Sequence, residues 1–275
     1  MSNEIEYSIE PSGNKVLNWS EIWRFKELFY FFTWRDIKVK YKQTVLGFLW
    51  AILQPLLMMA IFTLFFGRTL NVPSQNIPYP LFVYSGLLVW NIFSSGLINA
   101  SNSMINNASI IKKIYFPRIV IPVSSVFGAL FDFLMAFLLF IILMIFYDQP
   151  VSWKVLWCWP LSVVIGFMAT LGPGSLLAAL NVKYRDFRYI VPFLIQALLF
   201  LTPVIYPVDM LPHNALKYVI ALSPVYAAIE LFRMPLTGLF PETTLFFISL
   251  ASGLVFLVAG LVYFRKTEDF FADLA

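Results

Sequence analysis

The chain has 275 residues, of which 60% are apolar and only 12% are charged. Its mean hydropathy of +0.79 excludes a disordered chain and argues against a water-soluble globule, since soluble domains carry about 25% charged residues. With 18% aromatic residues the composition is typical of a multi-span membrane protein, whose small basic excess reflects orientation more than a ligand. Cys158 and His213 are the only residues of their types, so no internal disulfide or histidine-rich metal site is expected.

The N-terminal residues 1–18 contain three glutamates and lack the basic-then-apolar pattern of a secretory signal, so we expect a flexible cytoplasmic tail. Asn18 and Glu21 have the spacing of a helix cap, and Trp19–Phe32 is amphipathic, which predicts a helix lying in the membrane interface. In Trp34–Lys42 lysines alternate with apolar residues. This run could be a short strand, but we favour an interfacial linker whose lysines contact anionic headgroups.

Six apolar segments within residues 43–275 are each long enough to cross a membrane. They are Leu46–Phe66, Leu81–Ala100, Ile119–Tyr147, Leu156–Leu180, Tyr189–Tyr206 and Thr243–Phe264. Gly172-Pro173-Gly174 predicts a break in the fourth. Before the sixth, Ala215–Leu222 and Val225–Phe232 are too short to span, which predicts two re-entrant helices; a kinked seventh span is the alternative.

Basic residues are distributed very unevenly between the loops on the two sides of this map. One side carries 15 of the 19: Lys15, Arg24, Lys26, Arg35, Lys38, Lys40, Lys42, Lys112, Lys113, Arg118, Lys183, Arg185, Arg188, Arg265 and Lys266. The other side has Arg68, Lys154, Lys217 and Arg233. The positive-inside rule therefore predicts that both termini are cytoplasmic.

Signatures of enzyme chemistry are missing from the sequence. It has no phosphate-binding glycine loop and no dinucleotide-binding glycine pattern, so we expect no catalytic residue, no bound metal and no cofactor. Asp132 is the one acidic residue deep in a span, where a charge costs about 2.5–3.5 kcal/mol. We favour a structural hydrogen bond to another helix, because no basic residue has a similar predicted depth; a proton relay or substrate contact is the alternative.

Aromatic and amide side chains in the spans are candidates for lining a wet path across the membrane. The set is Trp50, Tyr84, Trp90, Asn91, Phe93, Asn99, Phe200 and Tyr206. Rings with a polar tip suit sugars, which have apolar faces and a polar rim. Interface anchoring and contacts between helices are the alternatives.

The loop after the second span is too polar to cross the membrane and too apolar for a free loop. A helix from Asn107 to Tyr115, ended by Pro117, would expose Ile110, Ile111 and Ile114. An exposed apolar helix indicates a protein partner. A helix that lies on lipid headgroups is the alternative.

Four motifs of this chain resemble those of ABC-2 type polysaccharide exporter permeases, in the order found in that family. The first is Trp34–Gln43 with Leu46-Gly47, Trp50 and Gln54-Pro55, and the others are Ile111–Arg118, Tyr184–Tyr189 and Thr202–Pro207. The group that exports O-antigen, capsule and teichoic acid is the most similar, and O-antigen exporters stand nearest within it.

The resemblance implies an all-α, ABC-2 (type V exporter-like) fold with six spans, in the bacterial inner membrane. Two copies would form a channel for a lipid-linked glycan, with no nucleic-acid partner, and two copies of a separate ATPase would bind the ATP and magnesium. Residues 19–42 would be the interface and gate segment, and Ala215–Phe232 would cap the channel outside.

The resemblance also assigns site residues. The glycan diphosphate would contact Trp34, Arg35, Lys38, Lys40 and Tyr41 at the cytoplasmic entrance. The ATPase would dock on Asn107, Ile110, Ile111, Lys112, Lys113, Tyr115, Phe116, Arg185 and Asp186. A permease for a small drug-like or lipid substrate and a proton-coupled carrier centred on Asp132 remain alternatives.

Overall fold

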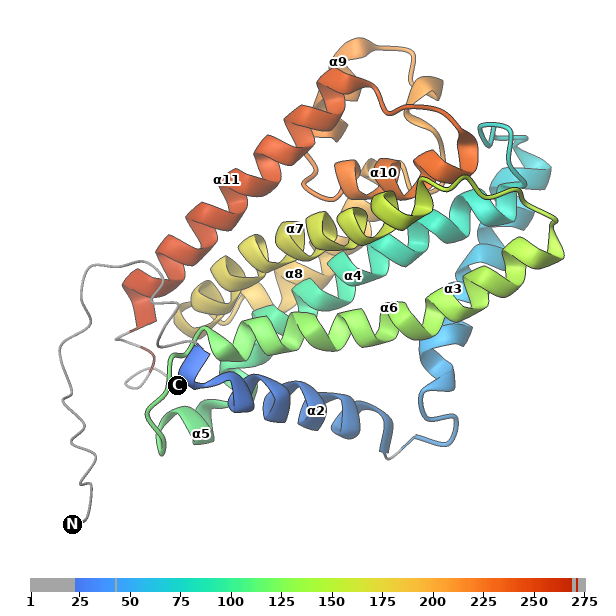
Figure 1. Cartoon of the computed structure of the whole chain (residues 1–275). Helices are drawn as coiled ribbons and strands as arrows, with labels where there is room; N and C mark the ends of the chain where they lie inside the picture. Colours follow the sequence, from blue (N-terminus) through green and yellow to red (C-terminus); the bar gives the residue numbers. More distant parts are fainter. Residues whose placement is uncertain (1–22, 43, 269–270, 272–275) are drawn as a thin grey trace.

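The computed structural model describes residues 23–42, 44–268 and 271, and within them all regular elements are helices (Figure 1). They are α2 (Lys26–Lys42), α3 (Leu49–Phe62), the π-helix η1 (Thr63–Thr69), α4 (Tyr79–Asn106), α5 (Ala108–Ile111), α6 (Val120–Phe146), α7 (Val155–Lys183), α8 (Phe187–Leu201), the short 3₁₀-helix η2 (Val208–Met210), α9 (Asn214–Ala221), α10 (Tyr226–Thr237) and α11 (Thr243–Thr267). Counting α3 with η1, five are long and apolar enough to cross a membrane. The expected all-α membrane fold is confirmed.

Helix α4 is the centre of the molecule. Its most apolar stretch is 78% buried, against 11% for α3 with η1, 28% for α6 and 22% for α11. Helices α6 and α7 both run alongside α4, which lies between them in Figure 1. A helix enclosed by protein can carry the many serines and asparagines of α4, because they bond to neighbouring backbone rather than face lipid.

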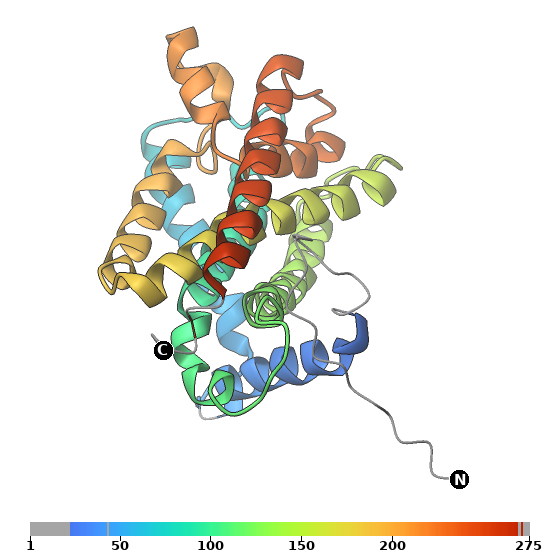
Figure 2. The same ribbon diagram turned by 90° about the vertical axis from the view of Figure 1, so that its left-hand side faces the viewer.

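Basic residues lie together at one end of the helices, here named the basic end. A buried cluster at this end contains Met104, Ile111, Phe116, Ala178 and Phe264, so it joins the loop before α6 to the last turns of α7 and α11. The basic loops 112–118 and 183–188 and the pair 265–266 are therefore neighbours. Figure 2 shows α2 and α5 at this end, far from α9.

The fifth crossing differs from the predicted Tyr189–Tyr206, because α8 ends at Leu201. Fifteen helical residues cover about 22 Å, less than the roughly 30 Å of a hydrocarbon core, and the chain continues from Thr202 to Pro207 without regular helix. Val204 nevertheless reaches the first turns of α4 at the opposite end, where Arg233 bonds both its carbonyl and that of Phe82.

Helices α9 and α10 meet at an angle of 99°. The Ala227 amide near the start of α10 donates to Ser249 of α11, and the Leu236 carbonyl near its end accepts from Gln149, just after α6. Both ends of α10 therefore lie opposite the basic end. This supports a re-entrant pair over a kinked seventh span.

Gly172-Pro173-Gly174 does not interrupt α7, which continues through it to Lys183, so the predicted break is wrong. The backbone of α7 instead touches that of α11 at Gly172. A Cβ added to Gly260 of α11 would overlap the carbonyl oxygen of Gly172. Small residues permit such close backbone contact between membrane helices.

The run Trp34–Lys42 is helical and belongs to α2, so both the linker and the strand interpretations are wrong. Thr33 contacts the carbonyl of Ser124 on α6, and eight residues later Tyr41 contacts Asp132, also eight residues further along α6. Equal offsets mean that α2 runs parallel to α6. The predicted helix start at Asn18 lies outside the described residues.

Candidate functional site

A groove with a cavity volume of about 1030 Å³ lies between α2, α4, α5 and α6 and reaches the start of α8. It is lined by Arg35, Asp36, Ile37, Val39, Lys40, Ile98, Asn99, Asn102, Ser103, Asn106, Asn107, Ser109, Ile110, Ser125, Gly128, Asp132 and Arg188. It unites two predicted entrance residues, Arg35 and Lys40, with the lining candidate Asn99 and the coupling residues Asn107 and Ile110.

Helix α2 contributes charged side chains to the groove. The Arg35 guanidinium lies 2.6 Å from the carboxylate of Asp36 and 4.8 Å from the ring centroid of Phe32. The Lys40 ammonium forms an ion pair with Asp132 of α6. The groove therefore has one wall of cations and carboxylates.

Asp132 also accepts a hydrogen bond from the hydroxyl of Tyr41. Burial and this carboxylate raise the pKa of Tyr41, so its hydroxyl remains a protonated donor. Asp132 thus has the predicted bond to another helix, but the expectation that no basic residue shares its depth is wrong. Asp132 lies about 18 Å from the start of α6 at Val120, at a rise of 1.5 Å per residue. Lys40 reaches the same depth because α2 runs alongside α6.

The wall opposite α2 is formed by amides and hydroxyls of α4. Asn102 bonds the carbonyl of Ile98 and accepts from Asn181 of α7, and Asn107 bonds the carbonyl of Ser103. These bonds hold two of the asparagines in place. Asn99 is exposed in the groove, where its amide can bond sugar hydroxyls.

Three predicted entrance residues, Trp34, Lys38 and Tyr41, lie outside the groove lining, although Tyr41 contacts the lining residue Asp132. The Lys38 ammonium lies 5.2 Å from the ring centroid of Trp34, an arrangement typical of a cation–π contact. Trp34 is 45% exposed and stacks on Tyr30. This pair forms a separate aromatic surface of α2.

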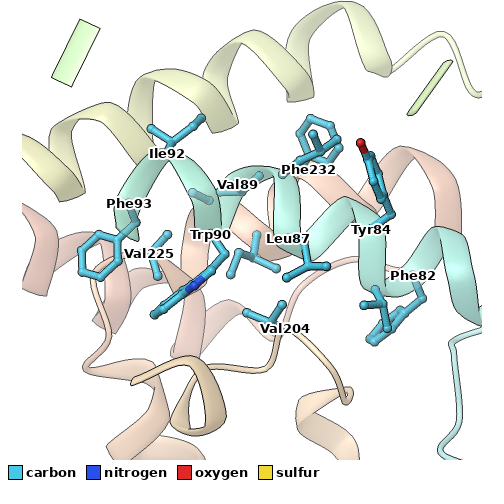
Figure 3. Close-up of a cluster of buried hydrophobic side chains, with 14 of the residues drawn as sticks. Phe82, Tyr84, Leu87, Val89, Trp90, Ile92, Phe93, Val204, Val225 and Phe232 are labelled. Atoms are coloured by element: carbon cyan, nitrogen blue, oxygen red, sulfur yellow. The ribbon is translucent and has the colours of Figure 1, made fainter. Parts of the chain in front are cut away.

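Three of the six aromatic lining candidates lie in the buried core instead of the groove. Tyr84, Trp90 and Phe93 are buried in the core around α4 (Figure 3), and the Tyr84 hydroxyl donates to the carbonyl of Ala136. Their side chains pack the core of this chain rather than line the groove.

The remaining candidates are more accessible. Trp50 and Phe200 are exposed, whereas Asn91 and Tyr206 are partly buried. The Tyr206 hydroxyl donates to the carbonyl of Phe200, 3.0 Å away. The groove lining includes none of these four residues, Trp50, Asn91, Phe200 and Tyr206.

The predicted helix Asn107–Tyr115 is shorter in the structure, where α5 covers Ala108–Ile111 and a turn follows. Asn107, Ile111 and Phe116 are buried and anchor the segment. The ring centroid of Phe116 lies 5.7 Å from that of Phe32 on α2, which connects this loop directly to the groove helix.

The exposed coupling residues form the surface that a partner can reach. Lys112, Lys113 and Tyr115 are exposed beyond α5, and Arg185 and Asp186 are exposed before α8. Arg185 lines a smaller pocket of about 300 Å³ with Asn181, Tyr189 and Arg188, among others. Arg188, which the sequence assigned no site role, lines both cavities.

The sequence counted Arg233 among the basic residues of the loops on the side opposite the termini, but it lies within α10 and is 1% exposed. Its guanidinium donates to the carbonyls of Pro203 at 2.7 Å, Val204 at 2.6 Å and Phe82 at 3.1 Å, and lies 3.5 Å from Glu230. It satisfies two carbonyls of the non-helical segment that follows α8 and ties them to the start of α4. The only sequence signal was an arginine within an apolar stretch.

Among the described residues no group of histidine, cysteine or acidic side chains could hold a metal ion.

A family model described as ABC-2 type transporter matches residues 27–237 of the chain. The chain belongs to the ABC-2 type transporter family. The resemblance seen in the four motifs is thereby confirmed.

Named members of the family resemble the chain over most of its length. The O-antigen export system permease protein RfbA of Klebsiella pneumoniae is 32% identical over 244 residues, which cover 87% of this chain and 92% of the relative. RfbA of Myxococcus xanthus is 33% identical over 207 residues, 74% of this chain and 78% of the relative. The polysialic acid transport protein KpsM of Escherichia coli is 24% identical over 247 residues, 86% and 91% of the two chains.

Proposed function

We propose that this chain is the membrane-spanning subunit of an ATP-driven exporter that moves a lipid-linked, O-antigen-like polysaccharide to the outer side of the bacterial inner membrane. The relatives named for O-antigen export support the substrate class. No glycine in the sequence is followed by lysine, so the phosphate-binding loop of an ATPase must come from a separate subunit.

The groove is the observation that carries the proposal. It offers arginine and lysine, which form charge-assisted bonds with phosphate, beside asparagine amides, which suit sugar hydroxyls. It lies towards the basic end, which the positive-inside rule assigns to the cytoplasm. A diphosphate-linked glycan would enter there.

ATP hydrolysis would act on the groove through the loop after α5. The ATPase would contact the exposed Lys112, Lys113 and Tyr115, and Phe116 would transmit the displacement to Phe32 of α2. Two copies of this chain would enclose the channel, with one ATPase below each.

The test is export of the polysaccharide to the cell surface in a strain that lacks its own exporter. We expect surface glycan only when this chain is expressed together with its ATPase, and none when the phosphate-loop lysine of that ATPase is replaced. Export that persists with the inactive ATPase and depends on a proton gradient would contradict the proposal and favour a secondary carrier.

A further inference from the structure

The charged residues that line the groove are unequally matched. There are five of them, three cations (Arg35, Lys40, Arg188) and two carboxylates (Asp36, Asp132). Each carboxylate forms an ion pair with one cation, Arg35 with Asp36 and Lys40 with Asp132. Arg188 forms no ion pair with any residue in the described part of the chain, and it is exposed to the cavity.

The two ion pairs also differ in what they hold. Arg35 and Asp36 are neighbours on α2, so their separation would move no helix. Lys40 and Asp132 join α2 to α6 across 92 positions of sequence. The Asp132 side chain is 13% exposed, whereas that of Lys40 is 46% exposed, so the lysine can be reached from the groove while its partner remains sheltered.

A cation held by a carboxylate and reachable by solvent is open to competition from a stronger acceptor. Phosphate groups offer more acceptor oxygens and more charge than a carboxylate. When Lys40 turns to such an anion, Asp132 still accepts the hydroxyl of Tyr41. The carboxylate is therefore not left without a partner.

We propose that Arg188 is the residue of the groove that first binds an anion, and that Asp132 is a built-in counter-ion that yields Lys40 to the bound phosphate. The ligand chemistry is a phosphate ester. Its assignment to the diphosphate of a lipid-linked glycan rests on the proposed function. Asp132 is thus a positioning residue that weakens anion binding, whereas a substrate contact would strengthen it.

The test measures the Kd of farnesyl diphosphate for the permease with its ATPase, held in phosphatidylcholine nanodiscs. Arg188→Gln should weaken binding about tenfold, the value of one charge-assisted hydrogen bond. Asp132→Asn keeps an acceptor for Tyr41 and frees Lys40, so it should tighten binding several-fold. Arg68→Gln, an exposed arginine on η1 at the opposite end, should leave the Kd unchanged.

A second comparison keeps the sign of the effect measurable if Asp132→Asn alone does not fold. Lys40→Gln leaves the carboxylate in the groove to repel the anion, so the double variant Lys40→Gln/Asp132→Asn should bind farnesyl diphosphate more tightly than Lys40→Gln. Asp132→Glu should restore a Kd near that of the natural chain. Equal or weaker binding after loss of the carboxylate, or an unchanged Kd in Arg188→Gln, would overturn the proposal.

Nanodiscs that contain phosphatidylglycerol distinguish the two sources of phosphate. If phosphatidylglycerol does not compete with farnesyl diphosphate, the diphosphate assignment stands. If it competes in the natural chain but not in Arg188→Gln, the site belongs to membrane headgroups and the diphosphate assignment is overturned. These measurements need no export. Failure of ATP-dependent export with the predicted Kd changes intact would therefore contradict only the proposed function.

Discussion

Arg233 and the Lys40–Asp132 pair are two charged assemblies with opposite surroundings. Arg233 is 1% exposed and donates to three backbone carbonyls from two segments of the chain. Lys40 is 46% exposed and contacts a side chain that can rotate away. A cation enclosed by main-chain acceptors can only be structural, because displacing it would leave several buried groups without partners. A cation at the edge of a groove can exchange its partner.

The same contrast extends to the helices around each assembly. Helices α4, α7, α10 and α11 pack through Arg233 and the glycine crossing, and they form a rigid part. Helix α2 contacts α6 through three polar side chains, Thr33, Lys40 and Tyr41, and the basic-end loop through Phe32. Its apolar contacts lie mainly in the N-terminal half, where Leu28, Phe29 and Phe32 pack against the buried cluster at the basic end. The C-terminal half is held by the polar contacts of Lys40 and Tyr41 and by the ring contact of Tyr41 with Phe131, which suits a part that must move to admit substrate.

The largest loss of stability should come from removing the guanidinium of Arg233. Arg233→Ala leaves Glu230 without its cation and removes the side-chain donor from the buried carbonyls of Pro203 and Val204, which should lower the free energy of unfolding by about 3–5 kcal/mol. Thermal unfolding of the purified protein in nanodiscs measures it, with Arg68→Ala as the exposed control. A loss no larger than that of the control would end the distinction between the two assemblies.

The next largest loss of stability is expected at the crossing of α7 and α11. Gly260→Ala places a methyl group against the carbonyl of Gly172 and should lower stability by about 1–3 kcal/mol. Gly253→Ala on the same helix is the matched control, since its Cβ would lie 3.7 Å from Pro224, an ordinary contact. Equal unfolding midpoints for the two variants would show that α7 and α11 do not touch at Gly172.

The smallest effect on stability is expected in the groove. The double variant Lys40→Met/Asp132→Leu replaces the pair with apolar side chains of similar size, and its stability should stay within about 1 kcal/mol of the natural chain. Export should nevertheless fall, because the groove loses a phosphate ligand. A loss of stability like that of Arg233→Ala would make this pair a structural element as well.

The sequence predicted the parts of this fold that depend on local pattern. Apolar length located the long spans, and the short segments Ala215–Leu222 and Val225–Phe232 predicted the pair α9 and α10. The end of α8 at Leu201 was missed, because the sequence does not show that Arg233 would bind the carbonyls released beyond it. The break predicted at Gly172 failed for a similar reason, since only the crossing with α11 reveals what that glycine is for.

The candidate site was predicted in part. The family resemblance assigned Arg35 and Lys40 to the entrance, but the partner of Lys40 lies 92 residues away, and no periodicity connects two such positions. Arg188 was given no role, although it lies in the motif whose Arg185 and Asp186 were assigned to the ATPase, and it lines the groove. Tyr84 and Trp90 are amphipathic residues whose sequence context is the same in a core and in a channel.

Site-specific photo-crosslinking tests the central claim most directly, namely that the substrate enters through the groove of α2, α4 and α6. A photoreactive residue is placed at Val39 or Asn99 in the groove, or at the exposed Phe240 near the opposite end, in cells that make the glycan and carry a hydrolysis-deficient ATPase to stop transport at entry. We expect crosslinked glycan at Val39 and Asn99, reduced by Arg188→Gln, and none at Phe240. Crosslinks at Phe240 with none in the groove would contradict it.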